Sequence, residues 1–291
     1  MTAYRLKQVL LRIDGRGYKA YKDLEGEYDF GEFKLAVDHV QGDPFAAPSR
    51  LSVFFPDSVA QFPREFTTPG HRRVAVGDFL ARAFDRAVKR HSKQRRGTGR
   101  SGEIYVDSGG QEVLERSSVL FDSAGVEARF FAGLPAAGRR VLGRQAEAML
   151  CNEIPKIVND ALLYRNILRE ELSCHVRVVE DQEVLRGQLK GKGLVTFIGN
   201  GSILPRRSGV DDRPLMEGQS QVLVPFQSPR ELEVELERPD SGPIKGMGIA
   251  EGVTVIVGGG YHGKSTLLRA IERGVYNHIP GDGRELTVTI G

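Results

Sequence analysis

The clearest pattern of hydrophobic and polar residues lies near the C-terminal end of the sequence. A β-branched apolar run, Val253–Val257, is followed by three glycines, and helix-forming residues continue from Thr266 after Lys264 and Ser265. This order predicts a buried strand, a tight glycine-rich loop and a helix in succession. It is the local context that a phosphate-binding loop requires.

Two further patterns precede this segment. Leu232, Val234 and Leu236 alternate with glutamates, which is typical of a half-buried antiparallel strand, and residues 244–249 can return as its partner. In the N-terminal half, apolar residues recur at helical spacing over residues 77–92. Short strand-like runs are expected at 103–106, 113–114, 118–121, 126–131 and 194–198, and helices at 139–152, 155–162 and 170–189, the last with a break near His175. The predicted fold class is α/β, with two parts, residues 1–155 and 156–291.

The glycine-rich loop supplies candidate residues for binding a nucleotide. Gly258 and Gly263 hold the two obligatory glycine positions, while Gly259 and Gly260 leave the backbone free to curl around an anion. Lys264 is expected to reach the β and γ phosphates and to act in catalysis, and the Ser265 hydroxyl to bind Mg²⁺. The other candidates are Tyr261, His262 and Thr266, of which Thr266 would donate to the α phosphate.

The sequence around the loop resembles a known family, the predicted ATPases of the ABC class. The resemblance rests on Gly246–Leu268, on Gly274–Glu285 and on the Tyr261-His262 pair inside the loop. Residues 14–22, 38–45, 97–102, 110–115 and 200–206 resemble the N-terminal domain of that family, so the similarity covers essentially the whole chain. It implies a mixed α+β N-terminal domain followed by part of a P-loop domain of the ABC type.

The resemblance also implies an activity for the complete family protein: binding of ATP and Mg²⁺, formation of a homodimer that encloses the nucleotide, and hydrolysis. One departure limits this expectation. Family members continue through a signature helix and a Walker B carboxylate pair, whereas this sequence ends 26 residues after Ser265. We therefore expect a piece of a longer protein that binds nucleotide weakly at best and does not turn it over. A small-molecule kinase is disfavoured, because no acceptor site follows the motif.

Composition narrows the class of protein further. Hydrophobic residues make up 40% of the 291 residues and charged residues 27%, which are values of a globular protein. The sequence has no apolar segment long enough to cross a membrane and no signal-peptide core at its start. Cys151 and Cys174 are isolated thiols, which favours a reducing, cytoplasmic location.

Charge is distributed unevenly along the chain. Residues 71–102 contain ten Lys or Arg against two Asp, a net charge of +8, whereas the whole chain carries +3. Such a stripe attracts phosphate backbones, so an alternative function is a nucleic-acid-binding module with a regulatory ATPase half. The other interpretation is a solvated face that neutralises acidic residues between Glu25 and Glu32. The candidate contacts to nucleic acid are Arg82, Arg86, Lys89, Arg90, Lys93, Arg95, Arg96 and Arg100.

A second group of charges lies in the glycine- and proline-rich loop of residues 199–214. Arg206, Arg207 and Arg213 alternate there with Asp211 and Asp212. Two interpretations are open, a phosphate-facing surface and mutual ion pairing, and the alternation favours pairing. His278, farther along the chain, has no neighbouring residue at a spacing that indicates chemistry.

Overall fold

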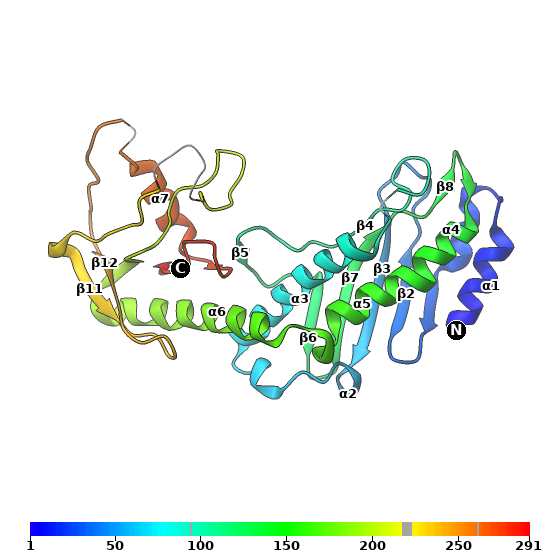
Figure 1. Cartoon of the computed structure of the whole chain (residues 1–291), viewed down its shortest axis with the longest axis horizontal. Coiled ribbons are helices and arrows are strands. Elements are labelled where there is room, and N and C mark those ends of the chain that lie inside the picture. The colour runs from blue at the N-terminus through cyan, green and yellow to red at the C-terminus, as the bar shows by residue number, and fades with distance from the viewer. Residues whose placement is uncertain (94, 217–222, 261) are drawn as a thin grey trace. The chain divides into compact units, whose positions relative to one another are not determined.

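The chain is organised into two compact units in the computed structural model, which describes all residues except 94, 217–222 and 261. Unit 1 contains Met1–Pro69, Val76–Ser108 and Glu115–Arg169, and unit 2 contains Gly70–Ala75, Gly109–Leu114 and Glu170–Gly291. Figure 1 shows the elements of both units. The chain passes from unit 1 into the long final segment of unit 2 between Arg169 and Glu170. The expected division between residues 155 and 156 stays a prediction.

An antiparallel sheet forms the centre of unit 1. Its strand order is β1-β2-β3-β7-β4, with β6 also paired to β7. In β3, Leu51, Val53 and Phe55 are buried and alternate with more exposed residues, the pattern of a sheet that buries one face. Val53 lies opposite Ala128 of β7. The strands are β1 (Gly26–Asp29), β2 (Lys34–His39), β3 (Ser49–Pro56), β4 (Ile104–Tyr105), β6 (Val119–Asp122) and β7 (Gly125–Ala132).

Helices cover one face of this sheet, where α3 and α5 run across the strands in Figure 1. The helix expected at residues 77–92 is confirmed and begins earlier, at Gly70. The helix expected at 139–152 begins only at Gly143, because Arg140–Val141 pairs with Ala136–Ala137 in a short hairpin. The remaining elements are α1 (Ala3–Ile13), α2 (Asp57–Ala60), α3 (Gly70–His91), β8 (Ala136–Ala137), β9 (Arg140–Val141), α4 (Gly143–Glu147), a π-helical segment (Ala148–Glu153) and α5 (Ile154–Leu162). Short 3₁₀ helices lie at Tyr18–Leu24, Arg64–Phe66 and Tyr164–Asn166.

Unit 2 is built on a second antiparallel sheet, with strand order β11-β12-β10-β14. The hairpin expected from the glutamate alternation is confirmed, since Val234 of β11 lies opposite Gly246 of β12. The helix expected at 170–189 is also confirmed and runs through His175 without a break. The elements are β5 (Glu112–Val113), α6 (Arg169–Leu189), β10 (Leu194–Gly199), β11 (Glu233–Leu236), β12 (Ile244–Ala250), α7 (Lys264–Arg273), β13 (Asn277–His278) and β14 (Thr287–Thr289), with 3₁₀ helices at Lys190–Lys192 and Arg230–Leu232.

The core of unit 2 lies on the two faces of its sheet. Leu185 and Leu189 of α6 pack against Phe197 on one face. Ala270 of α7 packs with Ile198 and other residues on the other face. Within the described residues, no helix is both long and apolar enough to cross a membrane.

One sequence prediction about unit 2 is wrong. Val253–Val257 does not form a buried strand: the segment has no regular structure, and Val253, Val255 and Val257 are 96%, 75% and 81% exposed. A strand exists only where a neighbouring strand accepts and donates its backbone hydrogen bonds, and no described strand pairs with this segment. The β-branched composition indicates a preference for the extended conformation, but composition alone does not supply a partner strand.

Candidate functional site: a glycine-rich loop at the start of α7

The glycine-rich loop takes the conformation that its glycines permit at two positions. Gly258 and Gly263 have φ angles of 149° and 78°, which residues with a Cβ rarely adopt. Gly259 and Gly260 are not among the residues with positive φ. The predicted contribution of Tyr261 lies outside the described residues. The two obligatory glycines therefore let the chain turn sharply into α7.

The first turn of α7 presents backbone amides without an acceptor in the described part of the chain. No side chain caps the helix, whose N-cap residue is Gly263. Leu267 donates its amide to the Gly263 carbonyl at 2.9 Å, but the amides of Lys264, Ser265 and Thr266 have no acceptor in the part of the chain that the structure describes. Free amides and the helix dipole together make such a terminus attractive to an anion.

Lys264 turns back over the loop from the first position of the helix. Its Nζ donates to the carbonyl oxygen of Gly258 at 2.7 Å and also to that of Gly259. His262 likewise turns toward the loop, since its Nδ1 accepts a hydrogen bond from the Gly259 amide at 3.2 Å. The loop therefore holds an ammonium group at the helix end whose first amides have no acceptor among the described residues.

Two pockets adjoin this helix terminus. One, of about 420 Å³, is largely apolar and is lined by Phe226, Ile256 and Leu267 together with Lys264 and Thr266. The other, of about 940 Å³, is polar, and Ser265 and Thr266 are among its lining residues. Thr266 thus lines both pockets, which lie at the start of the same helix.

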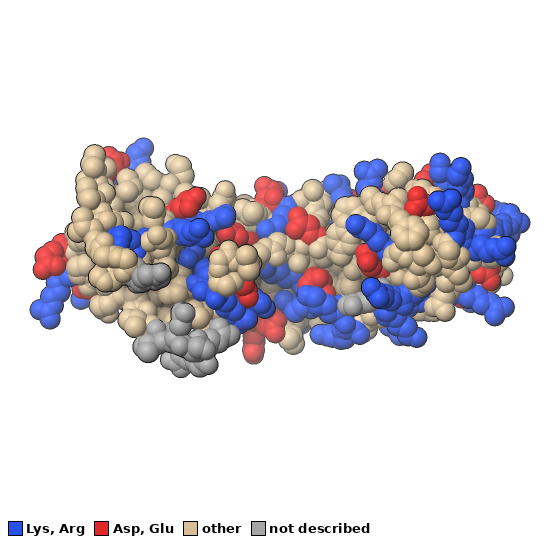
Figure 2. All heavy atoms as spheres, turned by 90° about the horizontal axis from the view of Figure 1, so that it is seen from above, with Lys and Arg blue, Asp and Glu red and all other residues tan. Residues whose placement is uncertain are grey.

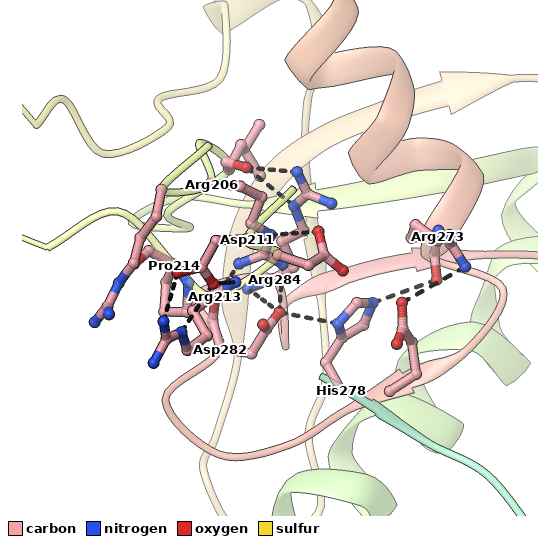
Figure 3. Close-up of polar contacts among 12 residues, drawn as sticks. Arg206, Asp211, Arg213, Pro214, Arg273, His278, Asp282 and Arg284 are labelled. Atoms are coloured by element: carbon pink, nitrogen blue, oxygen red, sulfur yellow. Dashed lines mark hydrogen bonds and ion pairs between the residues drawn. The ribbon is translucent and has the colours of Figure 1, made fainter. Parts of the chain in front are cut away.

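A buried cluster of charged residues lies near the polar pocket (Figure 3), and no pattern along the chain predicted it. His278 Nδ1 is 2.9 Å from Asp282 Oδ2, and Arg206 Nη2 donates to the same oxygen at 2.7 Å. The side chains of His278 and Asp282 are 1% and 0% exposed. Burial by itself raises the pKa of Asp282, but the hydrogen bond from His278 and the charge of Arg206 outweigh it, so the pKa is lowered.

The prediction that the arginines of the loop at residues 199–214 pair with the aspartates of the same loop is confirmed in part. Arg213 pairs with Asp211 at 2.6 Å, as expected (Figure 3). Arg206 is 3.7 Å from Asp212, but its closer partner is Asp282, which belongs to a segment more than 70 residues away in the sequence. The alternation of charges therefore predicted the local pair and missed the long-range one.

The basic stripe of α3 is largely neutralised within unit 1. Arg82 pairs with Asp78 and Lys89 with Asp85, each at 2.6 Å and four residues apart on the helix. Figure 2 shows basic and acidic atoms interspersed over the right-hand part of the visible face. The other ion pairs are Arg90 with Asp160 at 3.4 Å and Arg96 with Glu153, while Arg86 lies over the ring of Phe79 at 5.4 Å.

The prediction that this stripe neutralises the acidic residues between Glu25 and Glu32 is wrong. Glu32 pairs instead with Arg165 at 2.7 Å. Side chains four residues apart on one helix meet without any tertiary requirement, and this explains why the helix supplies its own carboxylates. Lys93, Arg95 and Arg100 are exposed and have no ion pair with the described residues.

The loop and helix define the class of this protein. A turn with positive φ at both obligatory glycines, entering an uncapped helix whose first lysine reaches back over it, is the arrangement of a P-loop. Residues 168–291 match the model of the P-loop domain of ABC-class ATPases.

Residues 3–165 match the family model described as the N-terminal part of ATPases of the ABC class, and the chain belongs to that family. One curated relative, the uncharacterized protein MJ1628 of Methanocaldococcus jannaschii, is 35% identical over 143 residues. The match covers 48% of this chain and 31% of the relative, so the chain aligns with about a third of that protein's length.

Proposed function

We propose that residues 258–266 bind the triphosphate of ATP together with Mg²⁺. The observation that carries this proposal is the position of the Lys264 ammonium over the loop, together with the amides of Ser265 and Thr266, which have no acceptor among the described residues. An ammonium and several free amides that face the same region are the groups that bind phosphate oxygens in a P-loop.

The other residues of the site fit this ligand. Ser265 is exposed and offers one hydroxyl, which suits Mg²⁺ because that ion keeps water and phosphate oxygens as its remaining ligands. The apolar pocket of about 420 Å³ is lined on one side by Lys264 and on another by Phe226, and its size and lining suit a nucleobase. Mg²⁺ would supply charge neutralisation at the phosphates.

Phosphate binding requires a rearrangement of Lys264. In the described structure the ammonium donates to the carbonyls of Gly258 and Gly259, so these contacts have to be exchanged for phosphate oxygens. The exchange is favourable because phosphate oxygens carry negative charge, so the ammonium gains a Coulomb attraction that neutral carbonyl oxygens do not offer.

The test is the binding of ATP to the purified chain, with and without Mg²⁺, by isothermal titration calorimetry. Lys264→Ala removes one charge-assisted interaction and is expected to weaken binding by about tenfold to a hundredfold. Lys190→Ala, at an exposed position in unit 2 away from the loop, is the matched control and should bind as the native chain does. Equal affinities for the two variants would contradict the proposal.

We further propose that hydrolysis and enclosure of the nucleotide between two copies belong to longer proteins of this family. The proposal rests on family membership. It concerns longer proteins because the match covers 31% of the length of the curated relative. A steady-state assay tests it: turnover of ATP by the purified chain that Lys264→Ala abolishes would contradict the first part. Elution of the ATP-bound longer protein as a monomer would contradict the second.

A second candidate function is binding of nucleic acid through unit 1. The observation that favours it is the exposure of Lys93, Arg95 and Arg100, which have no ion pair with the described residues. We propose these three as the contacts, because Arg82, Lys89 and Arg96 are already paired with carboxylates. Binding of single-stranded RNA or DNA should weaken steeply with rising salt. A triple variant with Lys93→Gln, Arg95→Gln and Arg100→Gln that binds nucleic acid as the native chain does would exclude this surface as the binding site.

A further inference from the structure

The polar pocket beside α7 is lined mainly by arginines. It is formed by three segments of unit 2: the loop of residues 206–212, the first three turns of α7 and the residue Arg284. Two carboxylates, of Asp212 and Glu272, also line it, so arginines outnumber acidic residues. The arginines are Arg206, Arg207, Arg269, Arg273 and Arg284.

Three of these arginines have no carboxylate within ion-pair distance among the described residues. Arg206 is paired with Asp282, and Arg273 is 3.7 Å from Glu112. By contrast, the side chain of Arg207 donates to the Pro214 carbonyl and to the sulfur of Met216 among the described residues. Arg269 and Arg284 form no ion pair with any residue that the structure describes. The described lining of the pocket therefore contains more guanidinium groups than carboxylates, and three of these guanidinium groups are outside ion-pair distance of any described carboxylate.

Arg284 is the most informative of the three because it is buried. It is only 3% exposed, and its Nε and Nη2 both donate to a single acceptor, the carbonyl oxygen of Leu204, at 3.0 and 2.7 Å. Burial, with the nearby charge of Arg206 as a second cause, lowers the pKa of Arg284 to about 10. A buried cation without a paired anion is costly, which makes a bound anion at this position favourable.

The helix supplies further groups on the side of the same pocket. Ser265, Arg269 and Arg273 follow one another at four-residue spacing, so their side chains lie along one face of α7. The Lys264 side chain does not line this pocket but lines the neighbouring apolar one. Guanidinium groups bind phosphate through paired hydrogen bonds, so an arginine-lined pocket suits phosphate in particular.

We propose that this arginine pocket, formed by Arg207, Arg269, Arg284 and their neighbours, binds a phosphate group through side chains that the loop at 258–265 does not supply. The phosphate has two conceivable sources: the terminal phosphate of a nucleotide in the P-loop, or a second phosphorylated ligand. The binding chemistry is the same for both.

The experiment uses the full chain and pyrophosphate as the probe, titrated by calorimetry at low salt. Lys264→Ala should retain pyrophosphate binding, whereas the double variant Arg207→Gln and Arg269→Gln should lose about tenfold or more in affinity. Arg230→Gln removes one positive charge at an exposed position outside the pocket and should change nothing. The double variant avoids Arg284, whose buried hydrogen bonds contribute to folding. Unchanged affinity in the double variant, or complete loss of binding in Lys264→Ala, would overturn the proposal.

The source of the phosphate follows from the same variants. If the pocket takes the terminal phosphate of a nucleotide, the double variant weakens binding of ATP but not of ADP, and pyrophosphate competes with ATP. If it takes a second ligand, pyrophosphate and ATP bind at the same time, and the double variant binds both nucleotides as the native chain does. Failure of ATP binding in Lys264→Ala with retained pyrophosphate binding separates this pocket from the P-loop.

Discussion

The buried charge cluster of unit 2 allows a stability prediction that follows from its geometry. Asp282 Oδ2 accepts a hydrogen bond from Arg206 at 2.7 Å and lies 2.9 Å from His278 Nδ1, and the Asp282 side chain is fully buried. Asp282→Ala leaves the Arg206 guanidinium buried without its closest anion. Breaking a buried ion pair from one side costs about 3–5 kcal/mol, so the free energy of unfolding of unit 2 should fall by this amount.

Hydrogen exchange measured by mass spectrometry is the suitable assay, because it reports the opening free energy of peptides from α6, β10 and β14 separately from those of unit 1. Asp211→Asn is the matched control: it removes a carboxylate from an exposed pair with Arg213 and should leave exchange in unit 2 unchanged. A loss below about 1 kcal/mol for Asp282→Ala, in the range of an exposed pair, would refute the reasoning.

The lowered pKa of Asp282 also leads us to expect that the stability of unit 2 depends on pH. Because the folded pKa of Asp282 lies below its ordinary value, the unfolded chain binds the proton more tightly. The contribution to stability is therefore present above the unfolded pKa of about 3.9 and is lost as the pH falls through the lower, folded value. The native chain should lose protection in unit 2 below about pH 4 more steeply than Asp282→Asn does.

Two further predictions concern packing and thiol chemistry. Gly133→Ala should destabilise unit 1 strongly, because a Cβ there would lie 1.8 Å from the Arg100 carbonyl oxygen. Gly187→Ala lies on an open face of α6 and should stabilise unit 2 by about 0.5–1 kcal/mol. Urea titrations followed by hydrogen exchange measure the stability of both variants. Burial raises the pKa of Cys151 to about 11, so its alkylation by iodoacetamide at pH 8 should be slower than that of a free cysteine peptide, and comparable rates would contradict the burial.

Local sequence patterns predicted the regular elements of unit 2 well. The alternation of Leu232, Val234 and Leu236 with glutamates indicated a hairpin, and β11 pairs with β12 as expected. The glycine loop entering a helix was equally visible, because Gly258 and Gly263 are required by backbone geometry. These features depend on neighbours along the chain, which is the information that a sequence pattern contains.

Interactions between distant segments were not predicted. His278 showed no partner in the sequence, yet it lies beside Asp282 and Arg206, and Arg284 joins the same region from a turn. The reverse error occurred at Val253–Val257, where β-branched residues indicated a strand but no described strand pairs with them. In both cases the outcome depends on which segments meet in space, and periodicity along one segment does not determine that.

The absence of a paired strand before the loop has a consequence for nucleotide affinity. Gly258 follows an exposed segment, so the loop is held in place from one side. It is attached there to α7, and Lys264 and His262 contact its backbone. Fixing each further backbone residue costs about 1–2 kcal/mol, and an anion that orders the loop has to offset this cost. We therefore expect weak binding of ATP by this chain. The affinity should rise when a partner strand pairs with Val253–Val257, because part of the ordering cost is then met before the nucleotide binds.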